Sequence, residues 1–137
     1  MDKIFVDTDI ILDLLSGRLP HHNFAAEVFS LADEGEVKLF VSSLSFANVN
    51  YILSRDHKGD QVRKKLLNFK TLVSVLPVNE KIIELALASE FKDFEDAIQY
   101  YTAIENDIAT LLTRNVKDFR KADISVMTAE QYVKSME

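Results

Sequence analysis

The sequence contains no cysteine, and it has only three glycines and two prolines among 137 residues. The lack of cysteine excludes a disulfide framework, a cysteine-ligated metal site and a thiol nucleophile, and it fits a reducing compartment. So little glycine and proline argues against a low-complexity or disordered chain. No uncharged apolar stretch approaches the roughly 20 residues of a membrane helix, and residues 1–7 carry no secretory signal. We therefore expect a cytoplasmic protein without a membrane partner.

The composition that remains is typical of one folded domain. Apolar residues make up 47% of the chain and charged residues 28%, which is enough to build a hydrophobic core. The chain has neither an internal repeat nor a composition shift that marks a linker. Residues 1–137 are therefore predicted to form a single domain.

The net charge of -6 is unevenly distributed. An acidic chain binds polyanions poorly, and its acid excess serves either solubility or the holding of a hard cation. In contrast, residues 54–70 hold six bases and two acids, which gives +4. This segment is either a solvated helical face or a patch that contacts RNA phosphates. The RNA-binding candidates are Arg55, Lys58, Arg63, Lys64 and Lys65.

Short apolar runs alternate with longer helical patterns along the whole chain. Strands are predicted at 4–6, 38–42, 72–76, 108–113 and 124–127, and helices at 9–15, 21–35, 44–55, 60–69, 79–90, 94–106 and from 128 onward. This alternation predicts a three-layer α/β/α sandwich with a central, mainly parallel sheet of four to five strands. Ligands of such sheets bind outside the carboxyl ends of the strands. No glycine-rich phosphate loop follows any strand, which weakens nucleotide-cofactor functions.

Acidic residues follow the first predicted strand. Asp7 ends this strand, and an acid in that place must be solvated, paired or coordinating unless it is a simple cap. Asp9 is predicted to cap the helix that follows. Asp13 is expected on the surface. Of the three, Asp7 is the candidate for chemistry.

Polar residues also follow the fourth strand and interrupt one helix. Thr113 and Asn115, with Asp118 close behind, form either a site or an ordinary strand-to-turn transition. Asn48 falls on the apolar stripe of its helix, so it is either a satisfied core amide or a neutral ligand. Each position has a structural and a functional interpretation.

The helix at 94–106 presents a second acidic pair at its start. A helical wheel predicts one polar face made of Glu95, Gln99, Thr102 and Asn106. Asp93 falls opposite this face, on the predicted buried side, and Asp96 falls on the flank. Alternatively, Asp93 caps the helix with Asp96 as its third residue. A metal role for Asp96 requires it to face Asp7.

Four segments together resemble the PIN domain family, a small magnesium-dependent ribonuclease fold. They are IFVDTDIILDLL, VSSLSFANVNYIL, FEDAIQYYTA and LLTRNVKDF. They occur in the order and at the spacing of the family, and the resemblance covers essentially the whole chain. Their form is most similar to the VapC-like toxin branch, whose members act beside an antitoxin and often form homodimers.

The resemblance implies a cation site with fewer acids than usual. Asp7 and Asp96 match acids that bind Mg²⁺ or Mn²⁺, with Asp93 and Asp118 as further metal ligands to consider. Asn48 stands where the family has a glutamate, and Asn115 stands where it has a fourth acid. Two adjacent divalent ions need several carboxylates between them, so one ion is favoured over two.

The implied activity is metal-assisted hydrolysis of RNA phosphodiester bonds. Its catalytic set is Asp7, Asp96, Asn48, Thr113 and Asn115. One alternative is a catalytically degenerate PIN fold that binds RNA or protein. The other is a phosphatase with an aspartate nucleophile, because Asp7-Thr8-Asp9 resembles the opening of haloacid-dehalogenase-type enzymes, although Ile11 departs from their pattern.

Overall fold

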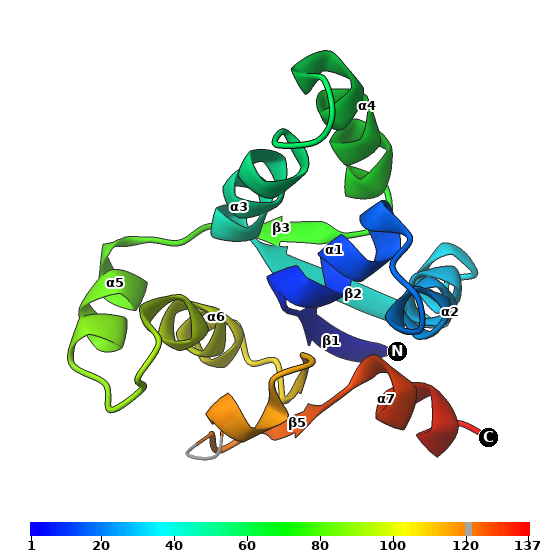
Figure 1. Ribbon diagram of the computed structural model, residues 1–137. Helices are drawn as coiled ribbons and strands as arrows, with labels where there is room; N and C mark the ends of the chain where they lie inside the picture. Colours follow the sequence, from blue (N-terminus) through cyan, green and yellow to red (C-terminus); the bar gives the residue numbers. More distant parts are fainter. Residues whose placement is uncertain (120–121) are drawn as a thin grey trace.

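The computed structural model describes residues 1–119 and 122–137, which fold into five strands and seven α-helices with one short 3₁₀ helix (Figure 1). In chain order, the elements are β1 (Asp2–Val6), α1 (Thr8–Ser16), α2 (His21–Asp33), β2 (Val37–Ser42), α3 (Ser43–Leu53), α4 (Gly59–Lys70), β3 (Ser74–Leu76), α5 (Glu80–Leu87), α6 (Phe94–Glu105), β4 (Thr110–Leu112), η1 (Val116–Phe119), β5 (Ser125–Met127) and α7 (Ala129–Ser135). Every predicted strand and helix is present. The 3₁₀ helix η1 was not predicted.

The five strands form one parallel sheet in the order β3-β2-β1-β4-β5. This confirms the predicted sheet and its upper strand number. The central strand β1 pairs with β4 so that Val6 lies opposite Leu112. The segments after these two strands, which begin at Asp7 and Thr113, therefore emerge side by side at the carboxyl edge of the sheet.

Alternating side chains of the strands bury two separate cores, which confirms the three layers. Ile4 and Val6 of β1 pack in the core that α1, α2, α3, α4 and α7 cover. Phe5 points to the opposite face, where α6 and η1 cover it. The α5–α6 pair lies on this second side of the sheet (Figure 1). The site at the carboxyl edge therefore lies between helices from both layers.

Side-chain caps fix where the helices begin. Asp7, Ser42, Asn79 and Asp93 each accept a hydrogen bond from a backbone N–H at the start of a helix, and Thr128 forms a full capping box with Gln131. Gly17 ends α1 with a φ of 68°, a left-handed conformation that glycine adopts without strain. No helix in the described part of the chain is long and apolar enough to span a membrane.

Candidate active site at the carboxyl edge of the sheet

Asp7 is the centre of the site, and three groups from different parts of the chain hold its carboxylate. It is 6% exposed and immediately precedes α1. Its Oδ1 accepts from the Thr8 amide at 2.7 Å and from Gln99 Nε2 at 3.3 Å, while its Oδ2 accepts from Thr113 Oγ1 at 2.8 Å. The Asp7 amide continues the sheet by donating to Leu112 O. Asp7 is therefore both a helix cap and a buried, oriented carboxylate, which combines the two interpretations of its sequence position.

Asp9 belongs to the same site, so the prediction that it is the helix N-cap was wrong. The helix begins at Thr8, two residues before the start that a cap at Asp9 implies, because the Asp7 side chain reaches the first free N–H and is the cap. Asp9 Oδ2 accepts from the Arg114 amide at 3.0 Å, from Thr113 Oγ1 at 3.3 Å and from Asn115 Nδ2 at 3.5 Å. Its Oδ1 is buried without a hydrogen-bond partner. The single Thr113 hydroxyl thus lies between two carboxylates.

Asp13 is buried, not on the surface as the sequence suggested. It is 1% exposed, and its Oδ2 forms an ion pair of 2.9 Å with Arg114 Nε. Burial raises the pKa of Asp13, and the charge of Arg114 opposes that increase. The position was misjudged because its cationic partner lies about a hundred residues away in the sequence. Arg114 thus fastens the loop after β4 to α1 through its side chain as well as its amide.

The predicted solvent-facing side of α6 is partly buried against the site. Gln99 is 1% exposed and Thr102 is fully buried, whereas Glu95 at the helix start is exposed. Gln99 Nε2 also lies 3.1 Å from Thr8 Oγ1 and 2.8 Å from Ser45 Oγ. The helical wheel identified the polar stripe of α6 correctly. It could not show that part of this stripe faces polar groups of α1 and α3 instead of water.

Asp96 lies one helical turn before Gln99, so its side chain points toward the same edge of the sheet. The side chain is half-buried. Burial, followed by repulsion from Asp93 and Asp118, raises the pKa of Asp96 to about 7. Burial, followed by repulsion from Asp9, raises the pKa of Asp7 to about 7, and Asp96 contributes to this increase. The charge of Asp96 therefore reaches Asp7 across the site, as a small part of the increase.

Asp93 is exposed, so the prediction that it lies on the buried side of α6 was wrong. Its Oδ1 accepts from the Asp96 amide at 3.0 Å, which makes it the helix cap. Capping holds the Asp93 side chain over the helix start, where a helical wheel no longer applies. Asp118, on η1, is also exposed. A cavity of about 700 Å³ is lined by Asp93, Asp96 and Asp118, together with Glu90, Phe91, Lys92 and Lys117.

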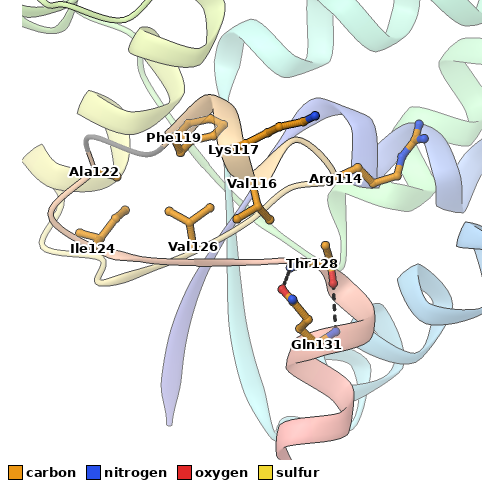
Figure 2. Close-up of a pocket in the computed structure, with 9 residues that line it drawn as sticks. All are labelled: Arg114, Val116, Lys117, Phe119, Ala122, Ile124, Val126, Thr128 and Gln131. Carbon is orange, nitrogen blue, oxygen red and sulfur yellow. Dashed lines mark hydrogen bonds between the residues drawn. The ribbon is translucent and has the colours of Figure 1, made fainter.

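A second hollow of about 560 Å³ lies on the other side of η1 (Figure 2). Val116 turns toward Ile124 and Val126 across this space, while Arg114 extends away from it toward α1. Lys117 lines both this hollow and the acidic cavity. Residues of the 3₁₀ helix thus line both an acidic cavity and a second one of mixed polar and apolar lining.

The two amides at positions where the resemblance leads us to expect acids, Asn48 and Asn115, lie in different settings. Asn48 is half-buried on α3, and its Nδ2 is buried without a partner. Asn115 is exposed, its amide N donates to Thr113 Oγ1 at 3.1 Å, and its side chain lies near Asp9. Asn115 is therefore joined to the site by hydrogen bonds, whereas Asn48 has no such link among the bonds of the described residues.

The basic candidates lie outside this cluster, on the α3–α4 hairpin that extends from the sheet at the top of Figure 1. All of Arg55, Lys58, Arg63, Lys64 and Lys65 are exposed. Arg55 stacks on the ring of Tyr51 at 4.8 Å, and Lys65 donates to Leu15 O. A role in RNA binding stays a prediction for this surface.

The donors of the site are carboxylate, hydroxyl and amide oxygens, which suit a hard divalent cation more than zinc or copper. Within residues 1–119 and 122–137, no three His, Cys, Asp or Glu side chains are already gathered tightly enough to enclose an ion. Two observations nevertheless fit a cation: Asp9 Oδ1 is buried without a partner, and the pKa values of Asp7 and Asp96 are both raised. A cation bound nearby would give the unpaired Asp9 oxygen a partner and would stabilise the ionised forms of Asp7 and Asp96.

Sequence reasoning missed six participants, which are Thr8, Asp9, Asp13, Ser45, Gln99 and Arg114. A usable signal existed for some of them. Thr8 and Asp9 directly follow the strand-end acid, and Gln99 lies three residues after Asp96, which places it on the same side of the helix. The sequence around Asp13 and Arg114 contains no pattern that would indicate their contact.

Comparison with known proteins agrees with this arrangement. The family model described as PIN domain matches residues 3–117. Ribonuclease VapC1 of Aquifex aeolicus (strain VF5) is 31% identical over 139 residues, which covers 96% of this chain and 93% of that protein.

Solved structures of similar fold include several toxin–antitoxin complexes. A toxin–antitoxin complex from Klebsiella pneumoniae contains a chain 26% identical to this one, with a TM-score of 0.69, covering 92% of this chain and 97% of that chain. VapBC-1 from nontypeable Haemophilus influenzae matches with 20% identity and a TM-score of 0.71, over 93% and 98% of the two chains. Since the family model matches most of the chain and a curated ribonuclease is 31% identical over 96% of it, this chain belongs to the PIN domain family.

Proposed function

We propose that this protein is a divalent-metal-dependent endoribonuclease and the toxin of a toxin–antitoxin pair. The observation that carries the proposal is the placement of two acids 89 positions apart at the same end of the sheet: Gln99, one helical turn after Asp96, donates to Asp7, and the pKa values of Asp7 and Asp96 are both raised to about 7. Such clustered, destabilised carboxylates are typical of functional sites. The similarity to Ribonuclease VapC1 supports RNA as the substrate.

Asp7 and Asp96 would hold Mg²⁺ or Mn²⁺, with Asp93 and Asp118 on the rim of the adjoining cavity as further ligands. When bound, the cation supplies a Lewis acid that lowers the pKa of water and neutralises charge on the scissile phosphate. The chain holds fewer acids than its family pattern, so we propose one resident ion.

The protein's own groups position the reaction. Thr113 holds the Asp7 carboxylate through Oδ2 and keeps the nearby Asp9 oriented. The exposed Asn115 amide can donate to a phosphate oxygen from beside Asp9, and Asn48 can orient a water molecule. The exposed bases on α3 and α4 would neutralise phosphates further along the RNA, which compensates for the acidic net charge.

Cleavage assays on structured RNAs test the proposal. Wild-type protein with Mg²⁺ or Mn²⁺ should cleave, and EDTA should abolish cleavage. Asp7→Asn and Asp96→Asn should each reduce the rate by about 100-fold or more, because each removes several kcal/mol of charge stabilisation. The exposed Asp56→Asn is the matched control. Equal cleavage by wild type, Asp7→Asn, Asp96→Asn and Asp56→Asn would show that Asp7 and Asp96 are not part of the active site.

The structural relatives also suggest how the protein is regulated. One of them is described as a toxin–antitoxin complex and several others as VapBC, and three of the structures are bound to DNA. We propose that this chain binds a cognate antitoxin in the cytoplasm and forms a homodimer. Co-expression with a neighbouring antitoxin gene product, followed by light scattering of the free and bound protein, measures both associations.

One observation favours a second function. Asn48 and Asn115 replace two family acids, and a site with fewer acids can bind RNA without cleaving it. Binding of RNA with no metal-dependent cleavage on any structured RNA would establish this degenerate form. The aspartate-nucleophile phosphatase is disfavoured, because Ile11 departs from the pattern of those enzymes and the family model described as PIN domain matches residues 3–117.

A further inference from the structure

A single buried amide on α6 is joined by hydrogen bonds to the starts of α1 and α3 at the candidate active site. Gln99 Nε2 lies 3.3 Å from Asp7 Oδ1, 3.1 Å from Thr8 Oγ1 and 2.8 Å from Ser45 Oγ. Thr8 and Ser45 are themselves linked, with their hydroxyl oxygens 2.9 Å apart. The amide therefore connects α6 to the start of α1, to α3 and to the Asp7 carboxylate.

The neighbours of the Gln99 side chain determine which of its two ends is the nitrogen and which is the oxygen. The Asp7 carboxylate only accepts when ionised, so the Gln99 group that faces it must be the N–H₂ donor. Two N–H groups then share three acceptors. The Gln99 carbonyl oxygen Oε1 is left buried without a hydrogen-bond partner.

Packing alone does not account for a glutamine at this position. A buried, unpaired carbonyl costs stability, and an apolar residue of similar volume would avoid that cost. Gln99 is 1% exposed, so water does not satisfy the group from outside. What the amide adds, relative to an apolar residue, is its donation to Asp7, Thr8 and Ser45.

We propose that Gln99 is a positioning residue for Asp7, whose amide keeps the carboxylate in the orientation that binds a divalent cation. This inference rests on the proposed metal-dependent function. Thr8 and Ser45 anchor the amide, and the amide restrains Asp7 Oδ1, which leaves Oδ2 beside Thr113 as the oxygen turned toward Asp9. Groups that orient metal ligands in this way commonly change metal affinity 10- to 100-fold when they are replaced.

Titration of the metal-free protein with Mn²⁺ alone, followed by calorimetry, tests the inference. Gln99→Met keeps the side-chain volume but removes the donor, and it should weaken Mn²⁺ binding by about tenfold or more. Its urea midpoint without metal should equal or exceed that of wild type, because the unpaired carbonyl is lost. A merely structural Gln99 would instead show reduced stability with unchanged affinity per folded molecule.

Thr102→Val is the matched control, since Thr102 is buried on the same helix and its hydroxyl bonds only to Ile98 O in the helix itself. It should leave Mn²⁺ affinity unchanged. Ser45→Ala provides a second variant if Gln99→Met does not fold; loosening the anchor should weaken binding about two- to fivefold.

The outcomes separate this inference from the function on which it rests. If wild type binds Mn²⁺ and Asp7→Asn does not, but Gln99→Met and Ser45→Ala bind like wild type, the positioning role is overturned and the metal site stands. If wild type does not bind Mn²⁺, or if Asp7→Asn binds equally well, both are overturned.

Discussion

Replacing Asp7 by asparagine should make the metal-free protein more stable at neutral and alkaline pH. The pKa of Asp7 is raised from 3.8 to about 7, chiefly by burial and then by the charge of Asp9. The folded state therefore holds a proton that the unfolded chain releases near pH 4. The contribution of Asp7 to stability is therefore greatest below about pH 4 and falls as the pH rises from about 4 to about 7, after which the loss is constant.

The magnitude follows from the size of the shift. Three pKa units correspond to about 4 kcal/mol at most, since each unit is 1.36 kcal/mol. Asparagine keeps most of the contacts: its Oδ1 can accept from the Thr8 amide and Gln99, and its Nδ2 can donate to Thr113 Oγ1. The Thr113 hydrogen can then turn to Asp9, 3.3 Å away. We expect Asp7→Asn to stabilise by about 2–4 kcal/mol at pH 8.

Urea unfolding in EDTA at pH 4, 6 and 8 measures this effect. The difference between Asp7→Asn and wild type should be small or reversed at pH 4 and should grow through pH 6 to a plateau by pH 8. Adding Mg²⁺ or Mn²⁺ should stabilise wild type but not the variant. The exposed Asp56→Asn should show neither behaviour. A variant that is no more stable than wild type at pH 8, or a difference that does not depend on pH, would refute the electrostatic reasoning.

Three further predictions concern the neighbours of Asp7. Thr113→Val should lower RNA cleavage about tenfold or more while Thr113→Ser retains activity, because the hydroxyl orients Asp7; equal rates would contradict this. Arg114→Gln should destabilise the protein by about 1–3 kcal/mol in urea at pH 8, because it leaves the buried Asp13 unpaired, and adding Asp13→Asn should restore most of the loss; additive effects would argue against the ion pair. Asn115→Asp should weaken metal-free stability by repelling Asp9 and should strengthen Mn²⁺ binding in calorimetry, whereas unchanged affinity would place position 115 outside the cation site.

The strands and helices could be predicted from the sequence because each buries a continuous or periodic apolar set. The three consecutive apolar residues Ile4, Phe5 and Val6 pack in two cores, one on each side of the sheet. A continuous apolar run of this kind is typical of a strand buried on both faces, so β1 could be predicted. The position of Asp7 followed directly, since the residue that ends a central parallel strand lies at the ligand edge. Asp96 was found through motif similarity, and the structure places it on the side of α6 that faces this edge.

The rest of the site depends on contacts between distant segments, which periodicity does not encode. A helical wheel separates polar from apolar residues, but it cannot distinguish water from a buried polar network, so Gln99 was assigned to solvent. Asp13 was expected on the surface for the same reason, because its partner Arg114 follows a different strand. Asp93 was misplaced because a residue outside the helix does not follow the helical period.

The bonds from Thr113 to Asp7 and from Arg114 to Asp9 join residues 106 and 105 positions apart. A growing chain emerges from the ribosome N-terminus first. Asp7 and Asp9 are therefore synthesised long before the hydroxyl and amide groups that orient them. The pairing of β1 with β4, which completes this edge of the sheet, forms only after β4 has been synthesised. This order of synthesis means that an unfinished chain lacks the groups that orient Asp7 and Asp9 until residues 113 and 114 have been translated.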